Sequence, residues 1–445
     1  MKIKKPPGIF IVFLAVFLVV VVFKSGYAQD LASKKIDIEM TAMPQISEPP
    51  PLVTWNIIDK LAEKDDELAR TSVSLGVTEK VYYENRISIR SDGTKSVTRK
   101  KLSDKERVLG LKLINTETGE VQVIKVETKI TVSGVTVKAP EGYQIETVER
   151  PNGIKWNYWN TLYRVTAPEN TVVIENFFPR EVRETISRVV KGKVRKEIKK
   201  VVRGFSYVPH SEFFEGGENE AILVEAGKNR DKSVVAEALA NLRERGVMSR
   251  SFPGTLVADV KALNPRFFER LPLLEQGDLT EFTLDPEKTV KRTLIILGAN
   301  GEIAWKYTCN RSDACGWIQF TPRTYRSLRV TFPAAKLIVD FKEGAGNQVN
   351  SMMAAILLFD YNLKDLVDKY GVKIAEDPLL GEYLAASYNG APKWVHHSLT
   401  ATISKGILDW VTALSPTRKD SRGGLRNETR GFIAKWRYLA ENDLP

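Results

Sequence analysis

The chain has 445 residues, of which 43% are hydrophobic and 27% are charged. This composition is that of an ordinary globular protein and argues against a disordered chain, and the length allows two or three domains. Lysine and arginine exceed aspartate and glutamate by 11 charges. That excess suits an anionic polymer, whether a wall polymer, a layer of lipid headgroups or a nucleic acid. A basic surface that only aids solubility is the alternative.

The first 28 residues predict export. Three lysines precede an unbroken apolar run over residues 8–23, and Gly26 and Ala28 then form the small-x-small pattern that a signal peptidase accepts. The run has 16 residues, fewer than the roughly 20 that a membrane-spanning helix needs. We therefore predict a signal peptide over residues 1–28, with an uncleaved N-terminal membrane anchor as the alternative. Either one places the chain in the periplasm or cell envelope and argues against a nucleic-acid partner.

Residues 29–75 predict a tether followed by a short helix. The stretch 29–53 contains four prolines and little periodicity, which is typical of a linker. Between Ile57 and Arg70 the apolar residues have helical spacing.

The segment 76–210 predicts a mainly-β domain. It contains short runs rich in β-branched and aromatic residues, separated by Gly and Pro turns such as the Asp-Gly pair at 92–93. Several short strands at this spacing indicate an all-β sandwich or a barrel-like domain. Trp156, Tyr158 and Trp159 cluster within it. They are interpreted as core or turn packing, with stacking on sugar rings as the alternative.

Residues 188–203 read RVVKGKVRKEIKKVVR, in which valine and isoleucine are interspersed with lysine and arginine. The pattern fits either a strand pair that turns at Gly192 or an amphipathic basic helix. A basic amphipathic helix would suit a membrane surface or an anionic glycan. The solvated face of an ordinary element is the simpler interpretation.

Beyond Glu218 the pattern changes to helices. Apolar residues recur at helical spacing over 221–226, 233–245, 255–263 and 286–298. An N-cap aspartate, a proline and an acidic first turn mark the start of the last of these. We therefore predict an α+β multidomain protein, with a helical connecting region over 211–285 and an all-α domain over 286–445.

The chain has two cysteines, Cys309 and Cys315. In an exported protein, two cysteines six residues apart predict one disulfide that closes a short loop, with two buried free thiols as the alternative. A zinc site would need more ligands nearby, and the histidines are His210, His396 and His397. No metal site is predicted.

Three stretches in the last third resemble soluble lytic transglycosylase domains, which are lysozyme-like. Residues 316–325 (GWIQFTPRTY) resemble the family's Gly-Leu-Met-Gln-x-x-Pro-x-Thr segment. Residues 386–390 (ASYNG) are similar to its Ala-x-Tyr-Asn-Gly, and residues 428–435 (ETRGFIAK) to its Glu-Thr-Arg-x-Tyr-Val-x-Lys. The three stretches occur in the family's order. The resemblance covers roughly residues 280–440 and does not include the β region.

The resemblance implies a single catalytic glutamate at a helix end, shortly before the Gly-x-x-Gln segment. Glu302 lies 14 residues before Gly316 and just beyond the predicted helix at 286–298, so it is the predicted catalytic acid. The family usually has Ser after this Glu, whereas this chain has Ile303. A carboxyl group in apolar surroundings has a raised pKa and can protonate a glycosidic oxygen.

The resemblance also implies supporting roles. Gln319 would hydrogen-bond the sugar near the cleaved bond, Tyr388 would orient the acid or the substrate's N-acetyl group, and Asn389 would line the same groove. Trp317 and Tyr325 are expected to add stacking or apolar contact with the substrate. The structural alternatives are a packed core tyrosine at 388, a buried or capping amide at 319, and a helix C-terminus at 389–390.

The predicted function is cleavage of the MurNAc-GlcNAc β-1,4 bond of peptidoglycan, with formation of 1,6-anhydro-MurNAc ends. Glu302 would act first as acid and then, as carboxylate, take the proton of the muramyl 6-hydroxyl, so no cofactor is expected. The alternatives are a muramidase-type hydrolase on the same scaffold and a catalytically inactive peptidoglycan-binding or envelope scaffold protein. The expected partners are peptidoglycan glycan strands, an envelope protein bound through the β domain, and the membrane if the N-terminus is uncleaved.

Overall fold

The computed structural model describes residues 55–76, 81–89, 93–103, 105–131, 134–148, 161–190, 193–310, 312–416 and 423–445. Within these ranges strands lie between 74 and 207 and helices predominate from 217 to 441, which confirms the predicted α+β class and the order of its two parts. The predicted signal segment, the tether and the aromatic cluster at 156–159 lie outside the described residues. Val53–Pro445 forms one compact unit.

The largest sheet has six strands, and all of its pairs are antiparallel. Its order is β10-β9-β4-β5-β6, with β1 paired to β4. These strands are β1 (Ser74–Leu75), β4 (Lys105–Asn115), β5 (Val121–Thr131), β6 (Gly134–Lys138), β9 (Thr171–Val190) and β10 (Lys193–Tyr207). Two separate antiparallel pairs are formed by β2 (Val81–Ile89) with β3 (Lys95–Ser103) and by β7 (Gln144–Thr147) with β8 (Tyr163–Ala167).

The described helices are α2 (Ile57–Ala62), α3 (Asp65–Arg70), α4 (Gly217–Glu244), α5 (Pro265–Glu269), α6 (Leu271–Gln276), α7 (Leu279–Leu284), α8 (Pro286–Asn300), α9 (Pro322–Thr331), α10 (Phe341–Gly346), α11 (Gln348–Tyr370), α12 (Leu380–Asn389), α13 (Pro392–Lys405) and α14 (Asn427–Glu441). Short 3-10 turns lie at Glu212–Phe214, Val257–Asp259, Gly301–Ile303, Pro333–Ala335 and Val372–Glu376. Helix α4 takes in both helices predicted at 221–226 and 233–245. The helix predicted over 255–263 is wrong, since that stretch forms only a single 3-10 turn.

Local sequence signals account for the start of α8. The Asp285 carboxylate accepts the backbone N–H of Lys288 at 3.0 Å, and Pro286 occupies the first helical position. Proline is tolerated there because its missing N–H would have no partner within the helix. The predicted start of this helix is therefore confirmed.

The two faces of the six-stranded sheet are covered by different partners. Successive side chains of a strand point to opposite faces, so Leu113 and Val173 pack with Tyr163 of β8, whereas their neighbours Ile114 and Ile174 pack against residues of α2, α4 and α8. Helices, and not a second large sheet, cover the latter face. The sandwich or barrel predicted for this region is therefore wrong.

The helical part shares one core that takes in residues from α4 through α14. Helix α11 lies within it and is buried along most of its length. Helices α4 and α8 approach closely at Gly227, where an added Cβ would lie 2.1 Å from the Leu294 carbonyl oxygen. Among the helices of the described residues, none combines the length and apolarity required to cross a bilayer.

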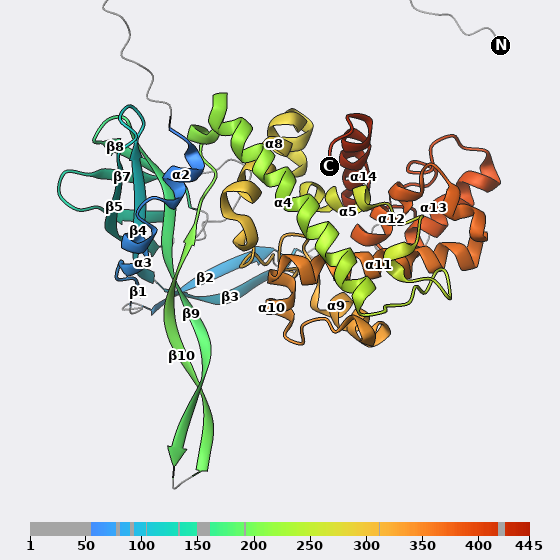
Figure 1. Cartoon of the computed structure of the whole chain (residues 1–445), viewed down its shortest axis with the longest axis horizontal. Coiled ribbons are helices and arrows are strands. Elements are labelled where there is room, and N and C mark those ends of the chain that lie inside the picture. Colours follow the sequence, from blue (N-terminus) through green and yellow to red (C-terminus); the bar gives the residue numbers. More distant parts are fainter. Residues whose placement is uncertain are drawn as a thin grey trace, which may run out of the picture. The chain divides into compact units, whose positions relative to one another are not determined.

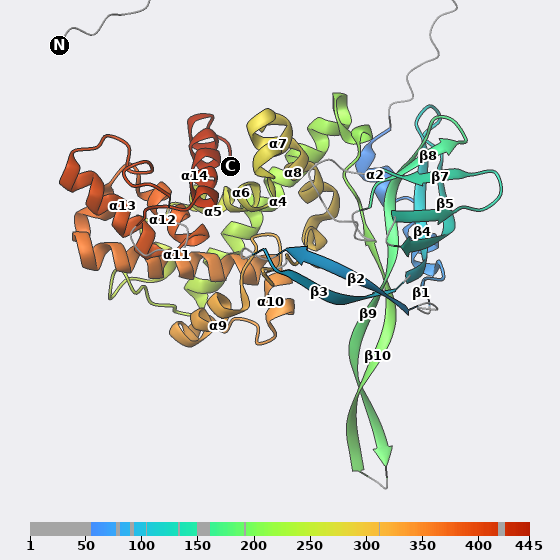
Figure 2. The same cartoon turned by 180° about the vertical axis from the view of Figure 1, so that it is seen from behind.

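Strands β9 and β10 continue together beyond the sheet as a two-stranded ribbon, seen from both sides in Figures 1 and 2. Strand β4 pairs with β9 only as far as Phe177, whereas β9 and β10 stay paired to Val190 and Lys193. The basic stretch at 188–203 is thus a strand pair, as one of its two interpretations predicted, and the helix interpretation is wrong. Gly192 itself lies outside the described residues.

Candidate active site

Helix α6 presents a glutamate at its C-terminal end. The helix begins with four buried residues, from Leu271 to Leu274, which anchor it in the shared core. Glu275 follows this apolar run and is only partly accessible to solvent, and Gly277 then ends the helix. The carboxyl group is therefore carried by a short, firmly packed element and surrounded largely by protein.

Burial controls the ionisation of Glu275. Its pKa is raised to about 8, chiefly by desolvation; the Lys435 ammonium lowers the pKa, and the nearby Glu428 carboxylate raises it. Desolvation is the largest of these effects, because a carboxylate loses more hydration on burial than one partly desolvated cation restores. At neutral pH the Glu275 carboxyl is therefore mostly protonated and can donate a proton.

Lys435 of α14 ties α6 to the last helix. Its Nζ donates to the carbonyl oxygens of Leu274 and Gly277, the latter at 2.8 Å. Burial lowers the pKa of Lys435, and the neighbouring Glu275 opposes that shift. The Lys435 ammonium thus lies at the C-terminal end of α6, where a positive charge is favourable because the helix dipole is negative there.

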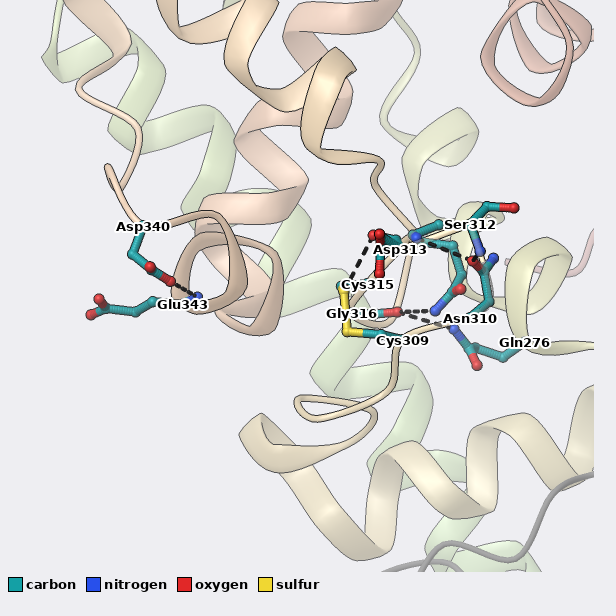
Figure 3. The surroundings of a disulfide bond; sticks show 11 residues. Gln276, Cys309, Asn310, Ser312, Asp313, Cys315, Gly316, Asp340 and Glu343 are labelled. Carbon is teal, nitrogen blue, oxygen red and sulfur yellow. Dashed lines mark hydrogen bonds between the residues drawn. A yellow bond between two sulfur atoms is a disulfide. The ribbon is translucent and has the colours of Figure 1, made fainter. Parts of the chain in front are cut away.

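The first motif lies directly beside α6. The Gln276 side-chain amide donates to the carbonyl oxygens of Trp317 at 2.6 Å and Gly316 at 3.4 Å, and Figure 3 shows Gln276 directed toward Gly316. Gly316 has a φ of +81°, and an added Cβ would lie 1.9 Å from the Ala345 carbonyl oxygen. Only glycine fits this position.

Gln319 adopts a left-handed backbone conformation, with a φ of 50°. Its side-chain amide donates to the Gly316 carbonyl at 2.7 Å, and the residue remains partly accessible. Such a conformation is uncommon for a residue other than glycine and is often found at functional sites. The predicted site residue Gln319 therefore belongs to the same loop that Gln276 holds.

Tyr388 connects the second motif to the first. It lies near the end of α12, and its hydroxyl donates to the Ile318 carbonyl oxygen. Burial raises its pKa well above the usual value, and the Glu275 charge raises it further. Tyr388 thus lies within electrostatic reach of Glu275, and its hydroxyl proton is already engaged by the first motif.

The third motif meets the second at Asn389. The Asn389 side-chain oxygen accepts the Thr429 hydroxyl at 2.9 Å, and the same first turn of α14 carries Glu428. The three motifs, which are far apart along the chain, thus converge on the end of α6. They assemble around Glu275, which sequence reasoning did not identify.

The structure places Glu302 in different surroundings. Glu302 is exposed in the 3-10 turn after α8 and lines a polar pocket of about 380 Å³ with Arg230, Glu237 and Lys306. Tyr388 lines another pocket, of about 450 Å³, and the two pockets share no lining residue. Glu275 is the carboxyl whose charge raises the pKa of Tyr388. Glu302 therefore stays a prediction from spacing, and Glu275 is the carboxyl that the structure associates with Tyr388.

Trp317 and Tyr325 are core residues. The Trp317 ring is fully buried and donates to the Ser351 hydroxyl at 2.8 Å. The Tyr325 hydroxyl donates to the Ile338 carbonyl at 2.8 Å and accepts from the Asn350 amide at 2.7 Å. Neither ring presents a surface to a substrate, so the expected stacking contacts are corrected to structural roles. Gln319, Tyr388 and Asn389 differ in that they all remain partly accessible.

Cys309 and Cys315 form the predicted disulfide. Cys315 also exchanges backbone hydrogen bonds with Phe320, at 2.8 and 3.0 Å, so the bridge and the Gln319 turn belong to one continuous loop. Among the described residues, no group of three or more histidine, cysteine, aspartate or glutamate side chains is placed to hold a metal ion.

Glu275 was missed because it lies 41 residues before Gly316, with α7 and α8 between them. The available signal was an acidic residue directly after a four-residue apolar run. Comparison with protein-family models, with curated proteins and with solved structures finds no match to this chain. The site is therefore interpreted from its own geometry.

Proposed function

We propose that the chain is a peptidoglycan lytic transglycosylase in which Glu275 is the catalytic acid and base. The observation that carries the proposal is a carboxyl of raised pKa at a helix end, with charged or ionisable residues of the second and third motifs within electrostatic reach and the first motif hydrogen-bonded to the adjacent Gln276. The resemblance of these motifs to lytic transglycosylase domains implies a lysozyme-like catalytic part and a glycan substrate. The position of the acid differs from the one that the family spacing implies.

The reaction would begin with proton transfer from Glu275 to the glycosidic oxygen. The bond from the MurNAc anomeric carbon to that oxygen then breaks, and GlcNAc leaves with a free 4-hydroxyl. In substrate-assisted glycosidases the substrate's own N-acetyl group stabilises the positive charge on the anomeric carbon, so no protein nucleophile is needed. A carboxyl that holds its proton up to about pH 8 suits this first step.

In the second step the Glu275 carboxylate would take the proton of the muramyl 6-hydroxyl. The 6-oxygen attacks the anomeric carbon, the 1,6-anhydro ring closes and Glu275 regains its proton. No water is consumed and no other co-reactant is required. Lys435 would stabilise the transient carboxylate, since it is the cation that acts on Glu275.

Tyr388 would act as a positioning residue. Its hydroxyl proton is donated to Ile318, so toward Glu275 it can present only oxygen lone pairs. An acceptor beside a carboxyl favours the protonated form and fixes the direction of its proton. Gln319 and Asn389, which are partly accessible, would contact the sugar near the cleaved bond.

A hydrolase is the second candidate, because Glu428 supplies another carboxylate near Glu275. It is exposed at the start of α14 and acts on the Glu275 pKa. Two carboxyl groups with a water between them are the arrangement of inverting glycosidases. In that reaction Glu428 would activate water, and the products would carry reducing MurNAc ends.

Digestion of purified peptidoglycan sacculi by the full chain tests both candidates, with products identified by mass spectrometry. The wild type should release 1,6-anhydro-muropeptides, and Glu275→Gln should lower the rate by at least about 100-fold, as expected for loss of a general acid. Glu302→Gln is the matched control and should keep a rate close to that of the wild type.

The other outcomes contradict parts of the proposal. Reducing ends that disappear in Glu428→Gln would identify the hydrolase. Loss of activity in Glu302→Gln alone would restore the acid predicted from spacing. Binding to sacculi without any product, in a folded wild-type chain, would indicate the inactive wall-binding protein.

A further inference from the structure

Two β-ribbons carry the net charge of this protein. The β2–β3 ribbon (residues 81–103) contains six basic and two acidic residues, and the β9–β10 ribbon (residues 180–203) contains ten basic and three acidic residues. Their net charges of +4 and +7 together equal the +11 of the whole chain, so the remainder of the sequence is neutral overall. The positive charge is therefore a property of the ribbons and not of the surface in general.

The same ribbons also expose apolar side chains. Of the twenty large hydrophobic side chains that are exposed in the described part of the chain, nine lie on these two ribbons, with exposed fractions between 42% and 73%. They are Val81, Tyr83, Ile87, Ile89 and Val97 on the first ribbon and Val189, Val194, Ile198 and Val202 on the second. Such a concentration marks a contact surface, since isolated exposed apolar residues are normally scattered.

Strand register places each apolar set on a single face. In the β9–β10 ribbon Val189 is paired with Val194, and the residues Ile198 and Val202 follow at even spacing along β10. In the β2–β3 ribbon Ile87 is paired with Val97. Because directly paired residues and alternate residues of a strand share one face, each ribbon has one face that contains all of its exposed large apolar side chains.

Basic residues stand between the apolar ones on these faces. Arg183 is paired with Lys200 on the β9–β10 face, and Lys95 is paired with Ile89 on the β2–β3 face. The three glutamates of the β9–β10 ribbon already pair with bases, at 3.8, 2.8 and 2.7 Å. Among the described residues of that ribbon, most bases thus have no acidic partner within it, so an anion from outside can contact them.

We propose that the two ribbons dock on the surface of an anionic lipid bilayer. Apolar side chains that alternate with cations match the bilayer interface, where the former enter the boundary of the acyl chains and the latter meet lipid phosphates. A second copy of the chain is disfavoured because two ribbons of like charge repel each other. A glycan is disfavoured because the exposed apolar side chains other than Tyr83 are aliphatic and lack the flat rings that stack on sugars, and Arg99 already lies over the Tyr83 ring. The inference does not depend on the proposed catalytic activity.

The β9–β10 ribbon is long enough for this role. From Phe178 to Val190 it is paired only within itself, and at about 3.3 Å per residue this part reaches roughly 40 Å. Docked through its apolar face, this part of the ribbon would lie along the lipid surface.

Vesicle flotation tests the proposal. The hydrophobic clusters of the described residues lie between Trp55 and Leu444, so a chain that begins at Val53 keeps these clusters and lacks the N-terminal apolar run. This chain should bind vesicles of phosphatidylcholine with 30% phosphatidylglycerol at least ten times more tightly than vesicles of phosphatidylcholine alone. Added salt should weaken the binding, because it screens the cations.

Two triple variants separate the apolar and the charged contributions. Val189→Ser, Val194→Ser and Ile198→Ser together, and Arg183→Gln, Lys196→Gln and Lys200→Gln together, should each weaken binding to anionic vesicles at least tenfold, since all six residues lie on the same face of the ribbon. These side chains are exposed, so the fold is retained, and a circular dichroism spectrum checks this. The matched control carries the same replacement by Ser at Val330, Val339 and Ile403, which are similarly exposed but lie outside the ribbons. This variant should bind like the wild type.

Three outcomes would overturn the proposal. One is equal binding to neutral and anionic vesicles. Another is no loss of binding in either ribbon variant. The third is a ribbon-dependent interaction with sacculi, with DNA or with a second copy of the chain, in the absence of vesicle binding.

Discussion

Replacement of Glu275 by Gln is predicted to stabilise the fold while it removes the proposed activity. The glutamine side chain has the same shape as a protonated glutamate and can occupy the same position at the end of α6. It cannot ionise, so it avoids the desolvation that raises the pKa of Glu275. A residue held in an unfavourable environment for chemistry costs stability, and its neutral counterpart recovers that cost.

The magnitude follows from proton linkage. The pKa of Glu275 rises from 4.5 to about 8, so the folded state keeps a proton that the unfolded chain releases. The contribution of Glu275 to the stability of the fold is therefore most favourable below pH 4.5, falls as the pH rises through this window, and levels off above about pH 8. With about 1.4 kcal/mol per pKa unit, the loss at pH 7 is at most about 3 kcal/mol, since the carboxyl keeps some contact with water.

Urea denaturation of the full chain at pH 5, 6, 7 and 8, followed by far-UV circular dichroism, measures the effect. The free energy of unfolding of Glu275→Gln minus that of the wild type should grow by up to about 1.4 kcal/mol per pH unit between pH 5 and 7. Glu302→Gln is the control, and its difference from the wild type should not change with pH because Glu302 is exposed. A Glu275→Gln difference that is flat or negative over this range would refute a desolvated carboxyl.

Three further changes test the packing. Asp231 is buried, and no hydrogen-bond partner of its carboxyl oxygens is found among the described residues. Because burial raises the pKa of Asp231 well above the usual value, Asp231→Asn should raise the urea midpoint at pH 7. An unchanged midpoint would contradict this prediction. Gly227→Ala would place a Cβ 2.1 Å from the Leu294 carbonyl oxygen, so it should lower the free energy of unfolding by about 1 to 3 kcal/mol. An unchanged free energy of unfolding would mean that α4 and α8 pack less closely. Replacement of Cys309 and Cys315 by Ser should cost about 2 kcal/mol in thermal or urea unfolding, from the entropy of the short loop that they close, and no loss would show that the loop is ordered without the bridge.

Local sequence signals were sufficient for much of the secondary structure. Proline after an N-cap aspartate started α8, alternating β-branched residues formed the strands, and cysteines six residues apart formed a disulfide. The basic stretch at 188–203 was compatible with either a helix or a strand pair. Its outcome depended on pairing of β9 with β10 and with the sheet, which periodicity alone does not reveal.

The sequence by itself located the three motifs, and the tertiary structure brought a distant carboxyl, Glu275, close to them. Spacing indicated Glu302, whereas the fold brings α12, α14 and the loop after the disulfide to Glu275. The physical reason is that a carboxyl acquires a raised pKa from every element that removes water around it. Those elements are distant along the chain, so the identity of the candidate acid is a property of tertiary packing.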